Sequence, residues 1–110
     1  MSNGTAWAYL VVAGLLEVAW ATSMKHSEGF RHLWPSVATI VLMMLSFALL
    51  SLAMRTLPLG TAYAVWTGIG AVGSVLVGML LMGESREPLR LASIALILLG
   101  ITGLRLLDGR

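Results

Sequence analysis

The amino-acid sequence predicts an all-α membrane protein with four transmembrane helices per subunit. Composition gives the first indication: 58% of the 110 residues are hydrophobic and only 11% are charged, against about 45–50% and about 25% in soluble domains. A soluble fold of this composition would expose large apolar patches and aggregate. The second indication is that the charges gather in short stretches, which leaves four long segments almost free of them.

These four segments have the length that a membrane requires. A helix needs about 20 mostly apolar residues to cross the hydrocarbon core. Transmembrane β-strands would instead appear as short segments of alternating hydrophobicity, and the sequence has no such pattern. We therefore expect a single transmembrane domain over residues 1–110, with helices at about 6–24, 34–53, 59–82 and 88–107.

The first segment also has a feature of a signal peptide, because Ala19-Trp20-Ala21 fits a cleavage site behind an apolar run. No basic residue precedes that run, however, and Glu17 would lie just ahead of the cut. We therefore expect the segment to be retained as a helix.

The connections between the segments are short. The first contains the turn-forming residues Ser27-Glu28-Gly29. Prolines stand near the expected starts of the three later helices, where proline is tolerated: Pro35, Pro58 and Pro88. Short connections make sequential helices antiparallel neighbours, and a four-helix bundle fills its centre with side chains. A pathway for a solute would therefore lie between subunits.

The positive charges favour neither side of the membrane. Orientation follows the distribution of Lys and Arg between the two sides. One side would carry Arg55, Arg105 and Arg110, and the other Lys25, Arg31, Arg86 and Arg90. Because three against four is almost no bias, we expect insertion in both orientations. Dual topology would permit an antiparallel homodimer with the site at the subunit interface.

Glu17 is the charged residue that lies well inside an expected helix. Burying a carboxylate there costs about 2.5–3.5 kcal/mol on insertion scales, so such residues usually line a polar pathway. The group would hold a proton when no cation is near and release it when one arrives. The alternative is a protonated Glu that only hydrogen-bonds a neighbouring helix. Proton and cation competing for one carboxylate would couple their movements.

Helical spacing identifies the neighbours that could share this site. Gly14 and Trp20 lie on the face of Glu17, where the glycine would leave space and the indole would add an aromatic wall. Tyr63 and Trp66 form a second adjacent pair, suited to a cation. For Trp20 the alternative is packing, and for the second pair it is an aromatic belt at the membrane interface.

Three further residues complete the candidate set. Gly68 and Gly70 would allow a kink in the third helix, which an alternating-access motion could use as a hinge. Ser46 is one of few hydroxyls in the second segment, and it either supports the site or bonds its own helix. The chain has no cysteine and therefore no thiolate metal site, and it lacks the basic stripe of a nucleic-acid-binding protein. We expect no metal, no cofactor, no nucleic acid and no enzymatic activity.

With these residues identified, the chain resembles the small multidrug resistance family of bacterial exporters. The resemblance extends over nearly the whole chain, Ala6–Leu107. It rests on four strings in order: Gly14-Leu15-Leu16-Glu17-Val18, Met24-Lys25-His26-Ser27-Glu28-Gly29-Phe30, Trp34-Pro35-Ser36 and Ala62-Tyr63-Ala64-Val65-Trp66-Thr67-Gly68-Ile69-Gly70.

This resemblance implies an antiparallel homodimer of dual topology in the bacterial inner membrane. It implies proton-coupled antiport with Glu17 shared by protons and substrate, a site lined by Tyr63 and Trp66, and a kink at Gly68–Gly70. The chain resembles the guanidinium-exporting branch in having a tryptophan, Trp20, three residues after Glu17. The polyaromatic-drug branch typically has glycine at this position. Ser46 and Gly14 also match the guanidinium-exporting branch.

We therefore expect guanidinium/H⁺ exchange by alternating access. Guanidinium is planar and presents paired N–H donors to a carboxylate; Trp20 and Ser46 would orient Glu17, while Tyr63 and Trp66 would gate or line the site. One alternative is a broader exporter of quaternary ammonium or substituted guanidinyl compounds. Another, of a different class, is a non-transporting membrane adaptor.

Overall fold

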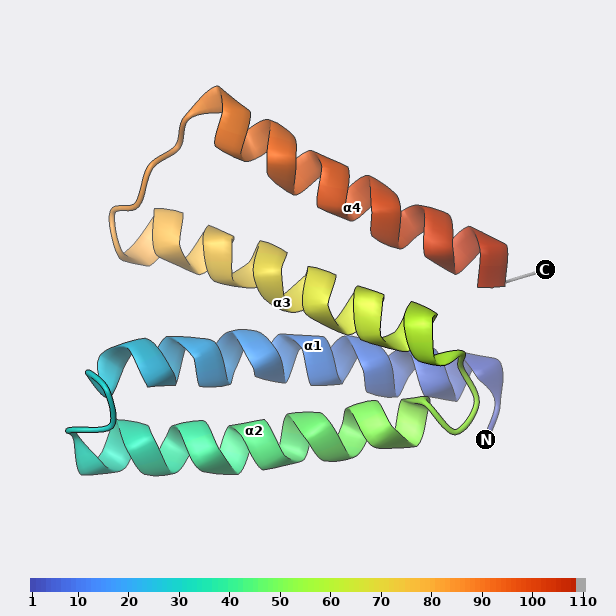
Figure 1. Cartoon of the computed structure of the whole chain (residues 1–110), viewed down its shortest axis with the longest axis horizontal. Coiled ribbons are helices and arrows are strands. Elements are labelled where there is room, and N and C mark those ends of the chain that lie inside the picture. The colour runs from blue at the N-terminus through green and yellow to red at the C-terminus, as the bar shows by residue number, and fades with distance from the viewer. Residues whose placement is uncertain (109–110) are drawn as a thin grey trace.

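The computed structural model describes residues 1–108, which form four helices joined by short connections (Figure 1). The helices are α1 (Asn3–His26), α2 (Leu33–Ala53), α3 (Leu59–Leu81) and α4 (Pro88–Asp108). All four are long and apolar enough to cross a membrane, which confirms the prediction of four transmembrane helices. Arg110, which the charge count assigned to one side of the membrane, lies outside the described residues.

The start of α1 is set by a serine cap. The Ser2 hydroxyl accepts a hydrogen bond from the backbone N–H of Thr5 at 3.1 Å, which satisfies one of the free donors in the first turn. The helix consequently begins at Asn3, ahead of the expected Ala6.

The connection between α1 and α2 is a tight turn built on Ser27. This side chain is fully buried, donates to the Met24 carbonyl at 2.7 Å and accepts from the Phe30 N–H at 3.1 Å. Three residues of the turn have positive φ: Glu28 (49°), Gly29 (74°) and Phe30 (66°). The buried hydroxyl therefore stabilises a backbone conformation that residues other than glycine seldom adopt.

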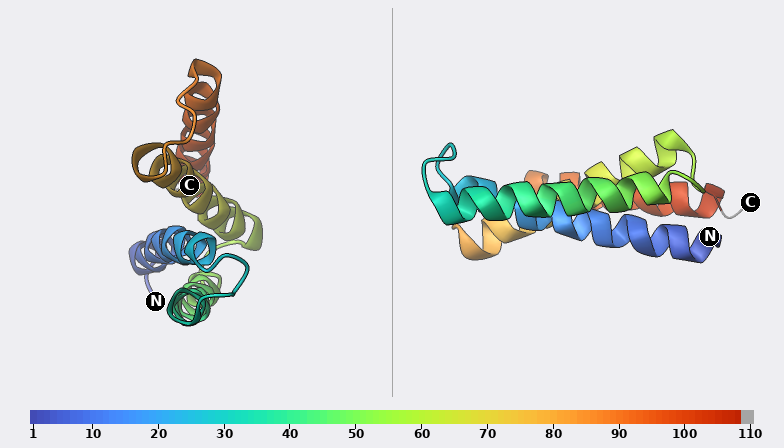
Figure 2. Two further views of the ribbon diagram at one scale, coloured as in Figure 1. Left: turned by 90° about the vertical axis from the view of Figure 1, so that its left-hand side faces the viewer. Right: turned by 90° about the horizontal axis from the view of Figure 1, so that it is seen from below.

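The helices form one layer in the order α2, α1, α3, α4 (Figure 1), and the end-on view in Figure 2 shows the same row. The Cα atoms span 45 × 34 × 16 Å, so the layer is little more than one helix thick. The expected bundle with sequential helices as neighbours is therefore wrong in one respect: α3 packs along α1, and α2 touches α3 only slightly. Both broad faces of the layer are left uncovered.

The core lies where α1 meets α2 and α3, around the fully buried Leu10 and Val65. By contrast, the backbone of α4 approaches only that of α3 within residues 1–108, and Ile94 is buried in this contact. Large apolar side chains along α4 are exposed, among them Leu89, Leu96 and Leu99. In water such a surface would be unfavourable, but in a bilayer it can face lipid or another helix.

Candidate functional site

Glu17 lies just past the middle of α1 and packs directly against α3. Its carboxyl occupies the space that a side chain at Gly70 would fill, so that a Cβ at position 70 would collide with it. One turn along the same seam, a Cβ at Gly73 would collide with Val18. The glycines of α3 therefore permit the close approach of α1 that brings the carboxyl onto the helix surface.

Two polar atoms at this site lack hydrogen-bond partners within residues 1–108. They are Oε1 of Glu17 and Nε1 of Trp20, both of them inaccessible to solvent. Buried polar atoms are nearly always satisfied, because an unpaired one costs about 1–3 kcal/mol. An unpaired carboxylate oxygen and an unpaired indole N–H three residues apart on α1 therefore mark a polar site with unused hydrogen-bonding capacity.

Ser46 of α2 does not contact Glu17 by hydrogen bonding; its hydroxyl joins the three inner helices instead. It donates to the Ala13 carbonyl of α1 at 2.7 Å and accepts from Nε1 of Trp66 on α3 at 3.0 Å. The expectation that Ser46 orients Glu17 is therefore not met in this structure, and the alternative that it bonds its own helix is wrong. Fully buried, Ser46 fixes the indole of Trp66.

A row of four aromatic rings runs across one face of the layer. Tyr63 and Trp66 of α3 lie with ring centroids 5.8 Å apart and planes tilted by 31°. Phe47 of α2 continues the row, 5.8 Å from Trp66 and 6.4 Å from Trp20 of α1. Phe47 was not among the residues predicted from the sequence, although it stands next to Ser46 in the second helix.

The outer part of this aromatic row is open. Tyr63 is 55% exposed and Phe47 is 48% exposed, whereas Trp66 is buried. Two cavities of about 660 Å³ and 130 Å³ are lined by other residues, and neither includes Glu17. Within residues 1–108 the aromatic row is therefore open at Tyr63 and Phe47, while Oε1 of Glu17 is buried.

Two of the predicted glycines serve helix packing. The nearest side chain to a Cβ on Gly14 would be Ile69, at 2.7 Å, so the space beside the carboxyl comes from Gly70 and not from Gly14. A Cβ on Gly68 would meet Ile101 of α4 at 2.8 Å. The helix α3 runs unbroken through Gly68 and Gly70, and the hinge stays a prediction.

The chemistry available to the site is that of one carboxylate and several aromatic faces. Within residues 1–108 no group of three His, Asp or Glu side chains is placed to hold a metal ion. A lone carboxylate with a free oxygen can bind a proton or a small cation with N–H donors. Aromatic faces nearby can stabilise the same cation through its charge.

Comparison with known proteins identifies the family of the chain. The family model described as Small Multidrug Resistance protein matches residues 5–97. The guanidinium exporter of Escherichia coli (strain K12) is 60% identical over 101 residues, which cover 92% of this chain and 96% of that protein. Guanidinium exporters of Citrobacter freundii and Salmonella typhimurium are 59% identical over the same coverage.

The match extends over most of the chain, and the four apolar helices are those that a multi-pass protein requires. The chain therefore belongs to the small multidrug resistance family and is a multi-pass protein of the bacterial inner membrane.

Proposed function

We propose that this protein is a proton-coupled antiporter that exports guanidinium. The observation that carries the proposal is the carboxyl of Glu17, the one Asp or Glu within the four spans, with a buried oxygen that lacks a partner within residues 1–108. The relatives that share 59–60% of the aligned residues are named guanidinium exporters. Similarity and geometry thus favour the same ligand class.

Guanidinium fits this carboxyl better than an ammonium ion with no N–H donors would. The ion is planar and offers two parallel N–H groups to a carboxylate, the bidentate pairing that Arg makes. Its flat faces suit the aromatic row that begins at Trp20. The unpaired N–H of Trp20 then donates to the ionised carboxylate and holds it in the binding orientation.

We place the complete site between two antiparallel copies of the chain. The exposed rings of Tyr63 and Phe47 are what a half-site would present before its partner closes it. The near balance of Lys and Arg between the two sides of the membrane supports insertion in both orientations. A homodimer of this kind would place two Glu17 carboxyls around one cation pathway.

Exchange follows from competition at the carboxyl. A proton on Glu17 removes the charge that binds guanidinium, and a bound guanidinium displaces the proton. Export against a gradient requires that the loaded site open to one side of the membrane at a time. Flexing of α3 at Gly68 and Gly70 would supply that motion, with Tyr63 and Trp66 moving at the edge of the pathway.

A broader substrate range on the same scaffold is the second candidate. The exposed rings of Phe47 and Tyr63 offer apolar surface to a substituted guanidinyl compound or a quaternary ammonium ion. Trp20 argues for the smaller ion because a bulky ring beside the carboxyl narrows the space around it. Substrates would therefore be ranked by size as well as by charge.

The test is transport into proteoliposomes driven by an imposed proton gradient. Wild-type protein should exchange guanidinium for protons, and Glu17→Gln should abolish exchange while the dimer persists in cross-linking. Glu28→Gln, on the exposed first connection, is the matched control and should leave exchange unchanged. Trp20→Gly should weaken guanidinium transport relative to that of a tetraalkylammonium ion.

The outcomes of these transport assays distinguish the candidate functions. Transport that survives Glu17→Gln contradicts the mechanism. A wild-type protein that forms dimers but moves neither ion is a membrane adaptor. Unchanged selectivity in Trp20→Gly would remove that residue as the determinant of substrate size.

A further inference from the structure

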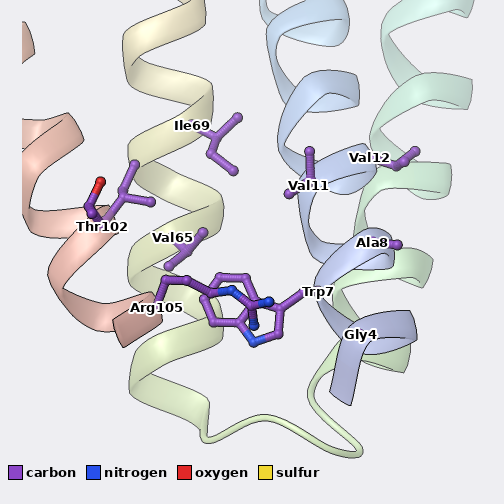
Figure 3. A pocket seen from close by; sticks show the side chains of 10 residues that line it. Gly4, Trp7, Ala8, Val11, Val12, Val65, Ile69, Thr102 and Arg105 are labelled. Atoms are coloured by element: carbon purple, nitrogen blue, oxygen red, sulfur yellow. The ribbon is translucent and has the colours of Figure 1, made fainter. Parts of the chain in front are cut away.

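A cavity of about 660 Å³ is an open groove between α1 and α4 with α3 as its floor (Figure 3). Its walls are apolar for most of their length, with Val11 and Val12 on α1 and Val65 and Ile69 on α3. One end is polar, because the side chain of Arg105 on α4 reaches across to Trp7 on α1. The groove thus combines a long apolar channel with a single positive charge at its mouth.

Arg105 is held in place in a way that leaves its hydrogen-bonding edge free. Its guanidinium lies over the ring of the buried Trp7, 4.6 Å from the centroid. A cation–π contact uses the charge of the group and not its N–H donors, so the donors stay available to an acceptor. Arg86 and Arg90 donate to a carbonyl and a carboxylate, but Arg105 has no acceptor among the described atoms.

The groove faces away from the site at Glu17. Successive residues of a helix are turned by about 100°, which places Val65 on nearly the opposite side of α3 from Tyr63. The aromatic row therefore lies on one broad face of the layer and the groove opens on the other. Closing a second copy over the aromatic row would leave the groove exposed to lipid.

We propose that this groove is a binding site for an anionic phospholipid. One acyl chain lies along Val11, Val12 and Ile69, and the phosphate accepts hydrogen bonds from the free edge of Arg105. Both Trp7 and Arg105 lie near the ends of their helices, at the depth where headgroups, tryptophan and arginine gather. The acyl chain would then run from this level toward the bilayer centre.

Charge decides between a lipid and a second molecule of cationic substrate. The lining contains one cation and no Asp or Glu among its ten residues, so that it repels guanidinium and attracts a phosphodiester. Because Arg105 is already immobilised on Trp7, little side-chain entropy is lost when the phosphate binds. The site is independent of the exchange proposed at Glu17, and its failure would leave that proposal standing.

Native mass spectrometry of the detergent-solubilised protein tests the site directly. The probes are phosphatidylglycerol and phosphatidylcholine with identical acyl chains. Wild-type protein should retain phosphatidylglycerol in preference, and Arg105→Gln should weaken that binding about tenfold, the loss of one charge-assisted interaction. Arg31→Gln, which removes a charge from an exposed loop, is the matched control and should change nothing.

A second variant tests the apolar half of the groove. Ala8 lines the wall and is exposed, so Ala8→Phe should narrow the channel and lower phosphatidylglycerol retention with Arg105 intact. Equal retention of the two lipids by wild-type protein would overturn the proposal. So would equal losses in Arg105→Gln and Arg31→Gln, which would mean that the lipid responds only to net charge.

Discussion

Replacing Gly70 with alanine should impair cation binding without destabilising the fold. The new methyl group would collide with the Glu17 carboxyl, which is the far end of a flexible side chain. That carboxyl can swing aside while the helices stay in place. Alanine also favours a helix over glycine by up to about 1 kcal/mol. The free energy of unfolding should therefore change little or rise.

Binding should suffer because the carboxyl can no longer occupy its position on α3. A hydrogen bond to a charged group is worth about 1.5–3 kcal/mol. The loss of one such bond corresponds to guanidinium binding that is about 10- to 150-fold weaker. This loss is larger than any effect that the added methyl has on helix stability.

Gly14→Ala is the matched comparison on α1. Its methyl group would lie 2.7 Å from Cγ2 and 2.8 Å from Cβ of Ile69. A branched side chain attached close to the backbone cannot swing aside, so α1 and α3 must separate. Overpacking of this kind costs about 1–3 kcal/mol, and the protein should unfold at lower temperature or denaturant concentration.

The two variants are measured by guanidinium titration in detergent and by thermal unfolding of the same preparations. Gly70→Ala should be stable and bind weakly, and Gly14→Ala should be less stable. If Gly70→Ala bound guanidinium with wild-type affinity, the carboxyl would not bind cation where the structure puts it. A destabilised Gly70→Ala would show that the helices, and not the side chain, give way.

Three further predictions follow from other contacts. Ser46→Ala should lower the free energy of unfolding by about 1 kcal/mol. The change removes a buried hydrogen bond between helices and leaves the indole N–H of Trp66 unpaired. An unchanged denaturation midpoint would contradict this prediction. Ser27→Ala should cost a similar amount, about 1 kcal/mol, by removing both hydrogen bonds that brace the first turn, while guanidinium exchange by the surviving folded fraction stays normal. The apparent affinity for guanidinium should fall as the pH is lowered, because protons then occupy Glu17. The fall should be about tenfold per pH unit where one proton is displaced. An affinity that does not vary with pH would rule out a carboxyl shared by both ions.

The helices could be predicted from the sequence because each depends on its own composition. Charge-poor segments of the required length specify the spans, and the observed bounds lie within a few residues of those expected. Differences arise at the ends, where local hydrogen bonds decide. Ser2 extends α1 toward the N-terminus through its cap, and such caps involve one or two atoms that hydropathy does not register.

The arrangement of the helices could not be predicted in the same way. Spacing along one helix shows which residues share a face, but it does not give the rotation of that face toward another helix. The sequence predicted space near Glu17 at Gly14 and a kink at Gly70, whereas the structure assigns that space to Gly70. The hydroxyl of Ser46 likewise reaches a carbonyl 33 residues away.

The single-layer arrangement has the same origin. Short connections restrict the helices to alternate in direction, yet they allow α3 to pack along α1 instead of α2. The choice depends on which surfaces are smooth enough for close contact, and here Gly70 and Gly73 supply that surface. The groove between α1 and α4, with Arg105 stacked on Trp7, follows from this order of helices.

The most direct test of the account is the proton released when guanidinium binds. Calorimetric titration of the detergent-solubilised dimer, repeated in buffers of different ionisation enthalpy, gives the number of protons displaced per guanidinium. We predict net proton release at mildly acidic pH, decreasing toward alkaline pH, and none in Glu17→Gln. Guanidinium binding that releases no proton at any pH across this range would contradict the claim that one carboxyl serves both ions.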